Sequence, residues 1–258
     1  MRGEAMRQIF LVSFIHYIRR LSRDIFGLLI FIALPVLLVF VLSTVASQNT
    51  EEQFIISGYN MLSSQVAIGM MLMFQLNGGI YLLNYLNQDL IKPMKWRLRV
   101  SPVHTYTLVF AATAACLVFT VIQGLFIVII TALFFDAYWG NIGITIMVII
   151  IVSLISQFIN FILFFLVRNL STAEYLSWFI SWSMAALGGV MFPLPDHSFF
   201  RFMKQYGTPI ALGHNMIRGS GSLGSSDVNL MFNLVILLSV MILLAFAVII
   251  IGNRKLDA

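Results

Sequence analysis

The side chains best placed to do chemistry lie in one basic stretch, residues 87–102, which separates two long apolar runs. Four of its residues are cationic: Lys92, Lys95, Arg97 and Arg99. Cations gathered this closely bind anionic groups, such as lipid phosphates at a membrane surface. The alternative is an ordinary loop between spans, because cytoplasmic loops of membrane proteins collect Lys and Arg.

Two prolines predict a short helix inside this stretch. Pro93 already has the backbone angle of a first helical turn, so a helix can begin there. Pro102 pushes Ser101 out of the helical region, which ends the helix after about two turns. Met94 and Leu98 then lie one turn apart on one side of it. We expect this helix to lie across the membrane surface.

Enzymatic chemistry is missing from the sequence. There is no Gly-x-x-x-x-Gly-Lys-Ser/Thr phosphate loop, and no Ser/His/Asp set or pair of carboxylates stands out. The histidines show no metal-ligand spacing: His16, His104, His197 and His214. The single cysteine, Cys116, falls inside an apolar run, so no disulfide forms within the chain. We predict no catalytic residue, no metal site and no cofactor on this chain.

The composition is that of a polytopic membrane protein. Hydrophobic residues make up 60% of the 258 residues, charged residues only 10%, and the mean hydropathy is +0.97. A soluble domain carries about 25% charged residues. The formal net charge is +5, and because the cations sit beside apolar runs, we expect anionic lipid rather than nucleic acid as their partner.

The apolar runs predict a single domain, residues 1–258, with the fold class of an all-α membrane protein. Each run is long enough to cross a bilayer as a helix, for which about 20 residues suffice. Six spans are expected: Ile25–Val45, Tyr59–Leu86, Thr107–Phe135, Ile142–Val167, Tyr175–Phe192 and Leu230–Ile251. We place both termini in the cytoplasm and the chain in the plasma (inner) membrane, because this orientation leaves most cations inside.

Residues 1–23 predict an amphipathic interfacial helix ahead of the first span. Its aromatic side chains follow helical spacing on one side, and we expect that side to face the acyl chains. The cations nearest the span are Arg19, Arg20 and Arg23. Asp24 follows at the mouth of the span, where we expect it to pair with Arg20 one turn earlier.

Uncharged polar residues inside the spans are candidates for a substrate path. They are Gln65, Asn77, Gln123, Gln157 and Asn160. The alternative is that they form hydrogen bonds between helices. No Asp, Glu, Lys or Arg lies in the middle of any predicted span, which counts against a proton- or sodium-coupled transporter.

The longest connection, residues 193–229, is too aromatic for an ordinary outer loop. We expect short helices that dip back toward the outer leaflet and pack against protein. The candidate outer gate consists of Phe192, Pro193, Phe199 and Phe200. The alternative is an interfacial helix without a gating role.

The whole chain resembles an ABC-2 type permease, the membrane subunit of a class of ABC exporters. The resemblance comes from the order of four features: the amphipathic helix ending Arg23-Asp24, a first span containing Pro35, the basic segment ending Arg99-Val-Ser-Pro102, and Leu187–Leu194 followed by Gly207-Thr-Pro209 and Arg218. One feature departs from the family. Where the family often has a Glu and a Gly-Thr pair, this chain has Asp89 and Ile91-Lys92-Pro93.

The resemblance implies that segment 88–101 couples to a separate ABC ATPase subunit, which binds ATP and Mg. The coupling residues it implies are Asp89, Lys92, Met94, Lys95, Trp96, Arg97, Leu98 and Arg99. It also implies a second permease chain, identical or related. The apolar interior favours an amphipathic or hydrophobic substrate, such as an antimicrobial peptide, a drug or a lipid. The alternative is a gradient-driven transporter or a structural membrane subunit without an ATPase.

Overall fold

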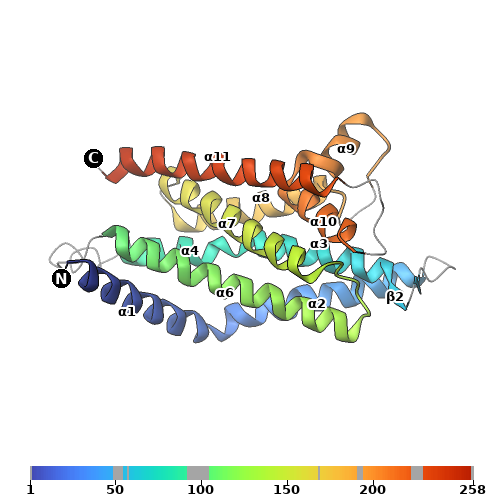
Figure 1. Cartoon of the computed structure of the whole chain (residues 1–258), viewed down its shortest axis with the longest axis horizontal. Helices are drawn as coiled ribbons and strands as arrows, with labels where there is room; N and C mark the ends of the chain where they lie inside the picture. Colours follow the sequence, from blue (N-terminus) through green and yellow to red (C-terminus); the bar gives the residue numbers. More distant parts are fainter. Residues whose placement is uncertain are drawn as a thin grey trace.

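A computed structural model describes residues 2–48, 55–56, 58–91, 105–167, 169–190, 194–221 and 229–256. Within these residues the fold is all-α, as predicted, apart from one small antiparallel hairpin, β1 (Ile55–Ile56) with β2 (Tyr59–Asn60). The long helices run roughly along one axis, and both chain ends lie at the same end of the bundle (Figure 1). We call this the terminal end, and the opposite end, where β2 lies, the hairpin end.

The helices follow one another along the chain and traverse the bundle repeatedly. The long ones are α1 (Arg2–Ser22), α2 (Ile25–Gln48), α3 (Met61–Asn77), α4 (Gly79–Leu86), α6 (Thr105–Phe134), α7 (Ile142–Leu166), α8 (Leu170–Leu187) and α11 (Leu230–Leu256). A π-helical turn, η1 (Asn87–Ile91), continues α4. Three short elements precede α11: α9 (Ser198–Phe202), the π-helical turn η2 (Met203–Gly207) and α10 (Pro209–Gly219).

The centre of the bundle is the α3–α4 rod. In its most apolar stretch 94% of the residues are buried, against 6% in α11 and 17% in α2. Its neighbours include α2, α6, α7 and α8, so the central rod is packed by protein while α2 and α11 keep most of their apolar side chains outward. An apolar outer surface is stable only in lipid, which agrees with a chain that lies in a membrane.

Five helical stretches are long and apolar enough to cross a membrane: Ile25–Thr44, Met61–Leu90, Tyr106–Phe134, Ile142–Leu166 and Leu230–Gly252. They correspond to five of the six predicted spans. The remaining one, predicted over Tyr175–Phe192, does not qualify. Its helix α8 contains serines and a glutamate among its apolar residues, which lower its hydropathy.

The bounds of α8 also differ from the prediction for a local reason. The helix begins earlier because the Asn169 side chain accepts a hydrogen bond from the Ser171 amide, as an N-cap does. It ends earlier because Gly188 and Gly189 follow, and Gly189 has a φ of +64°, which favours glycine.

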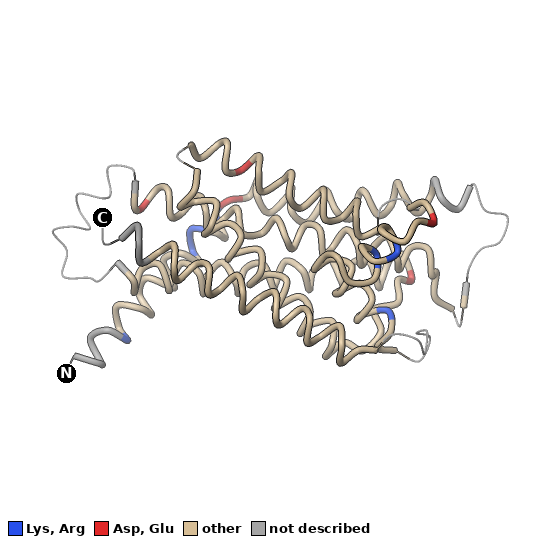
Figure 2. Tube along the Cα trace, turned by 90° about the horizontal axis from the view of Figure 1, so that it is seen from above, with Lys and Arg blue, Asp and Glu red and all other residues tan. Residues whose placement is uncertain are grey.

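Figure 2 marks the Lys, Arg, Asp and Glu positions along the backbone trace, and among the described residues they lie to either side of a central part of the bundle that carries none. This agrees with the sequence, in which the predicted spans have apolar middles.

The predicted orientation of the aromatic face of α1, toward the acyl chains, is wrong. Phe10, Phe14 and Tyr17 pack against the protein core rather than facing outward, and α1 lies beside the first half of α6 (Figure 1). The aromatic side is covered because Tyr17 packs against the Tyr85 ring of α4 and Phe10 against the Phe110 ring of α6, both at a tilted angle. Among the side chains of α1 that the structure describes, residues 7–22, the large apolar ones that are exposed are Leu11, Val12 and Ile15, so these can face lipid.

Candidate functional site

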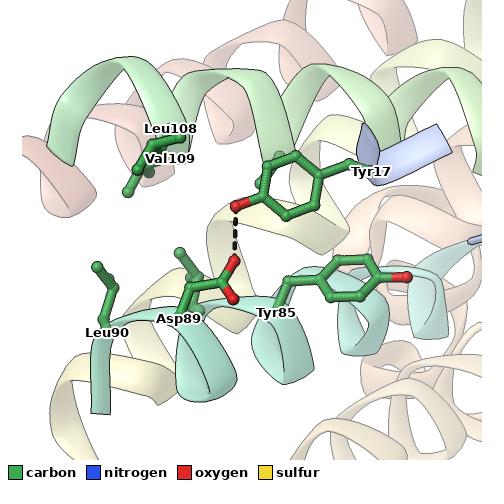
Figure 3. A pocket seen from close by; sticks show the side chains of 8 residues that line it. Tyr17, Tyr85, Asp89, Leu90, Leu108 and Val109 are labelled. Atoms are coloured by element: carbon green, nitrogen blue, oxygen red, sulfur yellow. Dashed lines mark hydrogen bonds between the residues drawn. The ribbon is translucent and has the colours of Figure 1, made fainter. Parts of the chain in front are cut away.

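A polar contact between distant segments joins α1 to η1 near the terminal end. The Tyr17 hydroxyl donates a hydrogen bond of 2.6 Å to Oδ2 of Asp89 (Figure 3). The other carboxylate oxygen lies 3.6 Å from Nη1 of Arg20. The Arg20 guanidinium also sits 4.6 Å from the centre of the Tyr85 ring, within the range of a cation–π interaction. We call these four residues the α1–η1 link.

Helical spacing brings the members of the link together in pairs. Tyr17 and Arg20 are three residues apart on α1, so they share one face, and Tyr85 and Asp89 are four apart on the other rod. The rings of Tyr17 and Tyr85 pack with their centres 5.5 Å apart. The π-helical turn begins at Asn87, so Asp89 lies in a turn geometry that occurs frequently at functional sites.

The link borders a small recess between α1, α4 and α6. Figure 3 shows the Tyr17 ring pointing from α1 toward the Asp89 carboxylate, with Leu108 and Val109 of α6 on the opposite wall. The free space is about that of one water molecule. The recess therefore has no room for a substrate, and its residues serve to join helices.

Partial burial strengthens the link. The Asp89 side chain is 15% exposed and that of Arg20 33%. Burial, followed by the hydrogen bond to Asp89, raises the pKa of Tyr17 well above its ordinary value, so the phenol stays protonated and donates. A hydrogen bond to a charged group contributes about 1.5–3 kcal/mol.

Asp89 is the one predicted coupling residue that the structure describes. The other seven, Lys92, Met94, Lys95, Trp96, Arg97, Leu98 and Arg99, lie outside the described residues. The α1–η1 link ends three residues before Lys92.

The expected pair between Arg20 and Asp24 is wrong. Arg20 pairs with Asp89 instead, while Oδ1 of Asp24 accepts a hydrogen bond of 3.1 Å from the Gly27 amide. Asp24 thus caps the first turn of α2, where backbone amides lack partners within the helix. Arg19 and Arg23 are exposed.

The candidate substrate-path residues are mostly buried and bonded within the bundle. The Gln123 amide donates to the Phe31 carbonyl of α2 at 3.0 Å. Oriented to suit its neighbours, Gln157 of α7 donates to the Thr113 carbonyl of α6 at 3.2 Å. Asn77 and Asn160 donate to carbonyls of their own helices, Met73 and Ser156. Gln65 is half-buried. The contacts of Gln123 and Gln157 agree with the alternative in which polar groups join helices, whereas those of Asn77 and Asn160 stay within one helix. A role in a substrate path stays a prediction.

A break in the central rod is the feature that sequence reasoning missed, since residues 59–86 were read as one continuous span. The Ser156 hydroxyl of α7 enters the backbone ladder there: it accepts from the Gly79 amide at 2.8 Å and donates to the Leu76 carbonyl. Inserted side chains of this kind bend helices. Gly79 permits the approach, because a Cβ at that position would lie 2.5 Å from the Ser156 carbonyl oxygen. The adjacent glycines at 78–79 were the available signal.

The outer segment divides into an exposed part and a buried part. Phe199 is exposed and Phe200 half-buried, with ring centres 5.4 Å apart in α9. Phe192 and Pro193, the other candidate gate residues, lie outside the described residues. In contrast, α10 is packed into the bundle, with Ile210, Leu212 and His214 buried. Helix α10 therefore packs against protein, as the sequence predicts for part of this segment.

Comparisons with models of protein families, with curated proteins and with solved structures found no match. The fold and composition define the chain as a multi-pass membrane protein with an all-α bundle.

Proposed function

We propose that this chain is the permease subunit of an ABC-2 type exporter, which moves an amphipathic or hydrophobic substrate across or out of the plasma membrane. The sequence resemblance supports the family. The α1–η1 link is the observation that supports the mechanism, because it joins α1 to Asp89, three residues before the first cation of the basic stretch, Lys92. ATP and Mg would bind to a separate ATPase subunit.

The mechanism is a mechanical one. When the ATPase displaces residues 92–99, Asp89 moves as well, because it lies only three residues before Lys92. From Asp89 the displacement passes in two directions: to α1 through Tyr17 and Arg20, and along α4 into the central rod. Because the central rod contacts α2, α6, α7 and α8, movement of this one rod changes the packing of all four. A second permease chain would complete the path.

Copurification tests the proposal. The chain is coexpressed with the reading frames that flank its own and isolated in mild detergent. We expect an ABC ATPase subunit to copurify with it, and we expect the double charge reversal Arg97→Glu with Arg99→Glu to weaken the complex. Arg201→Glu, in the outer segment, is the matched control and should leave it intact. Isolation without any ATPase, under conditions that preserve other complexes, would refute the proposal in favour of a stand-alone transporter or structural subunit.

A further inference from the structure

A short aromatic and basic element stands at the side of the bundle. It consists of α9 and η2, residues 198–207, and Figure 1 shows α9 near the place where α11 begins. Phe199 is 48% exposed and Phe202 56%, and the cations Arg201 and Lys204 are exposed as well. Within each pair the residues are three apart, so helical spacing places the two rings on one side of the element and the two cations on another. We call residues 198–207 the α9–η2 element.

The second half of the α9–η2 element is fixed to the bundle. The Asn215 side chain of α10 donates hydrogen bonds to the Lys204 and Gln205 carbonyls, at 3.2 and 3.3 Å. The Tyr206 ring packs against the Phe232 ring of α11, with ring centres 5.4 Å apart. In the first half, by contrast, none of the five residues of α9 is buried. The element is therefore held beside α11 while its phenylalanines stay uncovered.

The adjoining surface of α11 indicates what covers these rings. The membrane-crossing stretch of α11 begins at Leu230, and Met231 and Phe232 at its start are 73% and 49% exposed. An apolar surface on a membrane span is covered by lipid. Tyr206 contacts Phe232, and Phe202 packs against Tyr206 with ring centres 6.3 Å apart. The exposed rings therefore continue the lipid-facing surface of α11 at the border of the bilayer.

The cations of the element have a charge that the described protein does not balance. Within the described residues no carboxylate forms an ion pair with Arg201 or Lys204, and segment 194–221 holds three cations, with Arg218, against the single carboxylate of Asp196. A helix with aromatic residues on one side and Lys or Arg on another lies in the membrane interface, with its cations among the headgroups. Anionic headgroups supply the complementary charge, and their phosphate oxygens accept hydrogen bonds from Arg and Lys.

We infer that the α9–η2 element is a docking surface for anionic phospholipid. Phe199 and Phe202 lie at the boundary of the acyl chains, and Arg201 and Lys204 bind lipid phosphates. The element is thereby attached to the bilayer beside α11. This inference goes beyond the proposed function and does not depend on it, because an exporter, a gradient-driven transporter and a structural subunit all present this surface to the same lipid.

The experiment measures lipid near the element itself, because cations elsewhere on the chain also attract anionic lipid. The full-length chain with Phe202→Cys and Cys116→Ala carries a nitrobenzoxadiazole fluorophore at position 202. It is placed in nanodiscs that contain phosphatidylcholine and phosphatidylglycerol in equal amounts, and a nitroxide on the acyl chains of one lipid or the other quenches nearby fluorophores. We expect quenching by both lipids, with phosphatidylglycerol more effective by a factor of at least about three.

Charge-neutralising variants localise the preference. Arg201→Gln with Lys204→Gln removes two charges from exposed positions and should bring the ratio of the two quenching efficiencies down to about one. The matched control is Arg19→Gln with Arg23→Gln, which removes two exposed charges from α1 and its end and should leave the ratio unchanged. A fluorophore at Leu133→Cys, a position 73% exposed near the end of α6, should be quenched equally by the two lipids.

Three results would overturn the inference. The first is absence of quenching at position 202 by either lipid, which would place the element in water or against another protein. The second is equal quenching by the two lipids, which would mean that the rings enter the bilayer without recognition of anionic headgroups. The third is an unchanged ratio in Arg201→Gln with Lys204→Gln. None of these results depends on whether an ATPase copurifies, so the inference and the proposed function fail separately.

Discussion

Removal of the Tyr17 hydroxyl tests the α1–η1 link most directly. The substitution Tyr17→Phe keeps the ring that packs against Tyr85 and deletes only the 2.6 Å hydrogen bond to Asp89. If this bond holds α1 against the bundle, the variant should open α1 more often without unfolding the rest of the chain.

The environment of Asp89 sets how much free energy the loss of this hydrogen bond costs. A hydrogen bond to a charged group contributes about 1.5–3 kcal/mol. Asp89 keeps Arg20 at 3.6 Å and retains 15% exposure, so the carboxylate is not left entirely unpaired. We therefore expect a loss of about 2 kcal/mol, which corresponds to about thirtyfold more frequent opening.

Hydrogen–deuterium exchange measured by mass spectrometry reports this opening, because amides of α1 exchange when the helix detaches. Peptides from α1 should exchange about thirtyfold faster in Tyr17→Phe, while peptides from α7 should be unchanged. Tyr106→Phe is the matched control, since Tyr106 is exposed on α6. Equal exchange of α1 in the variant and the unaltered chain would refute the reasoning that this bond holds α1 in place.

Three further results are expected from buried groups. Ser156→Ala should lower the free energy of unfolding by about 2 kcal/mol, because it orphans the Gly79 amide; thermal unfolding in detergent measures this, with the exposed Ser239→Ala as control. Burial, more than the nearby Arg218, lowers the pKa of His214 to about 4, whereas in the unfolded chain it is near 6.5. The unfolded chain therefore binds the proton more readily, so the contribution of His214 to the free energy of unfolding is full above about pH 6.5 and falls as the pH drops toward 4. The loss at pH 5 is about 2 kcal/mol, and in His214→Asn the slope of unfolding midpoint against pH should flatten between pH 4 and 6.5; an unchanged slope would contradict the assignment. Cys116 is fully buried, so a maleimide should label it only after denaturation, and rapid labelling of the folded chain would contradict its burial.

Hydropathy predicted most of the fold because lipid permits few alternatives. A long apolar run must satisfy its backbone internally, which makes it a helix wherever it lies. The same reasoning is weakest for α8. Its first residue is set by the Asn169 cap and its last by the glycines that follow, of which Gly189 has a positive φ, and neither effect depends on hydropathy.

The sequence predicted which polar residues form contacts but not which residues they contact. Arg20 has a carboxylate one turn away at Asp24, and local spacing favours that pair, yet Arg20 pairs with Asp89 once α1 packs against the central rod. Likewise, the sequence identifies Gln123 and Gln157 as buried polar groups, but only the packing of α2, α6 and α7 decides which carbonyl each one meets. Long-range partners depend on the tertiary arrangement, which a single sequence does not encode in its local spacing.

The Ser156 insertion has a consequence for how the chain is made. The hydroxyl that supplies a partner for the Gly79 amide belongs to α7, which is synthesised well after the central rod. A newly inserted segment alone in lipid has no substitute for that partner, so it is expected to cross first as an uninterrupted helix. The bend is then introduced during assembly, when the later helix arrives, and a chain truncated before residue 142 should lack it. Spin labels at the two ends of the rod would measure the difference as a change in their separation.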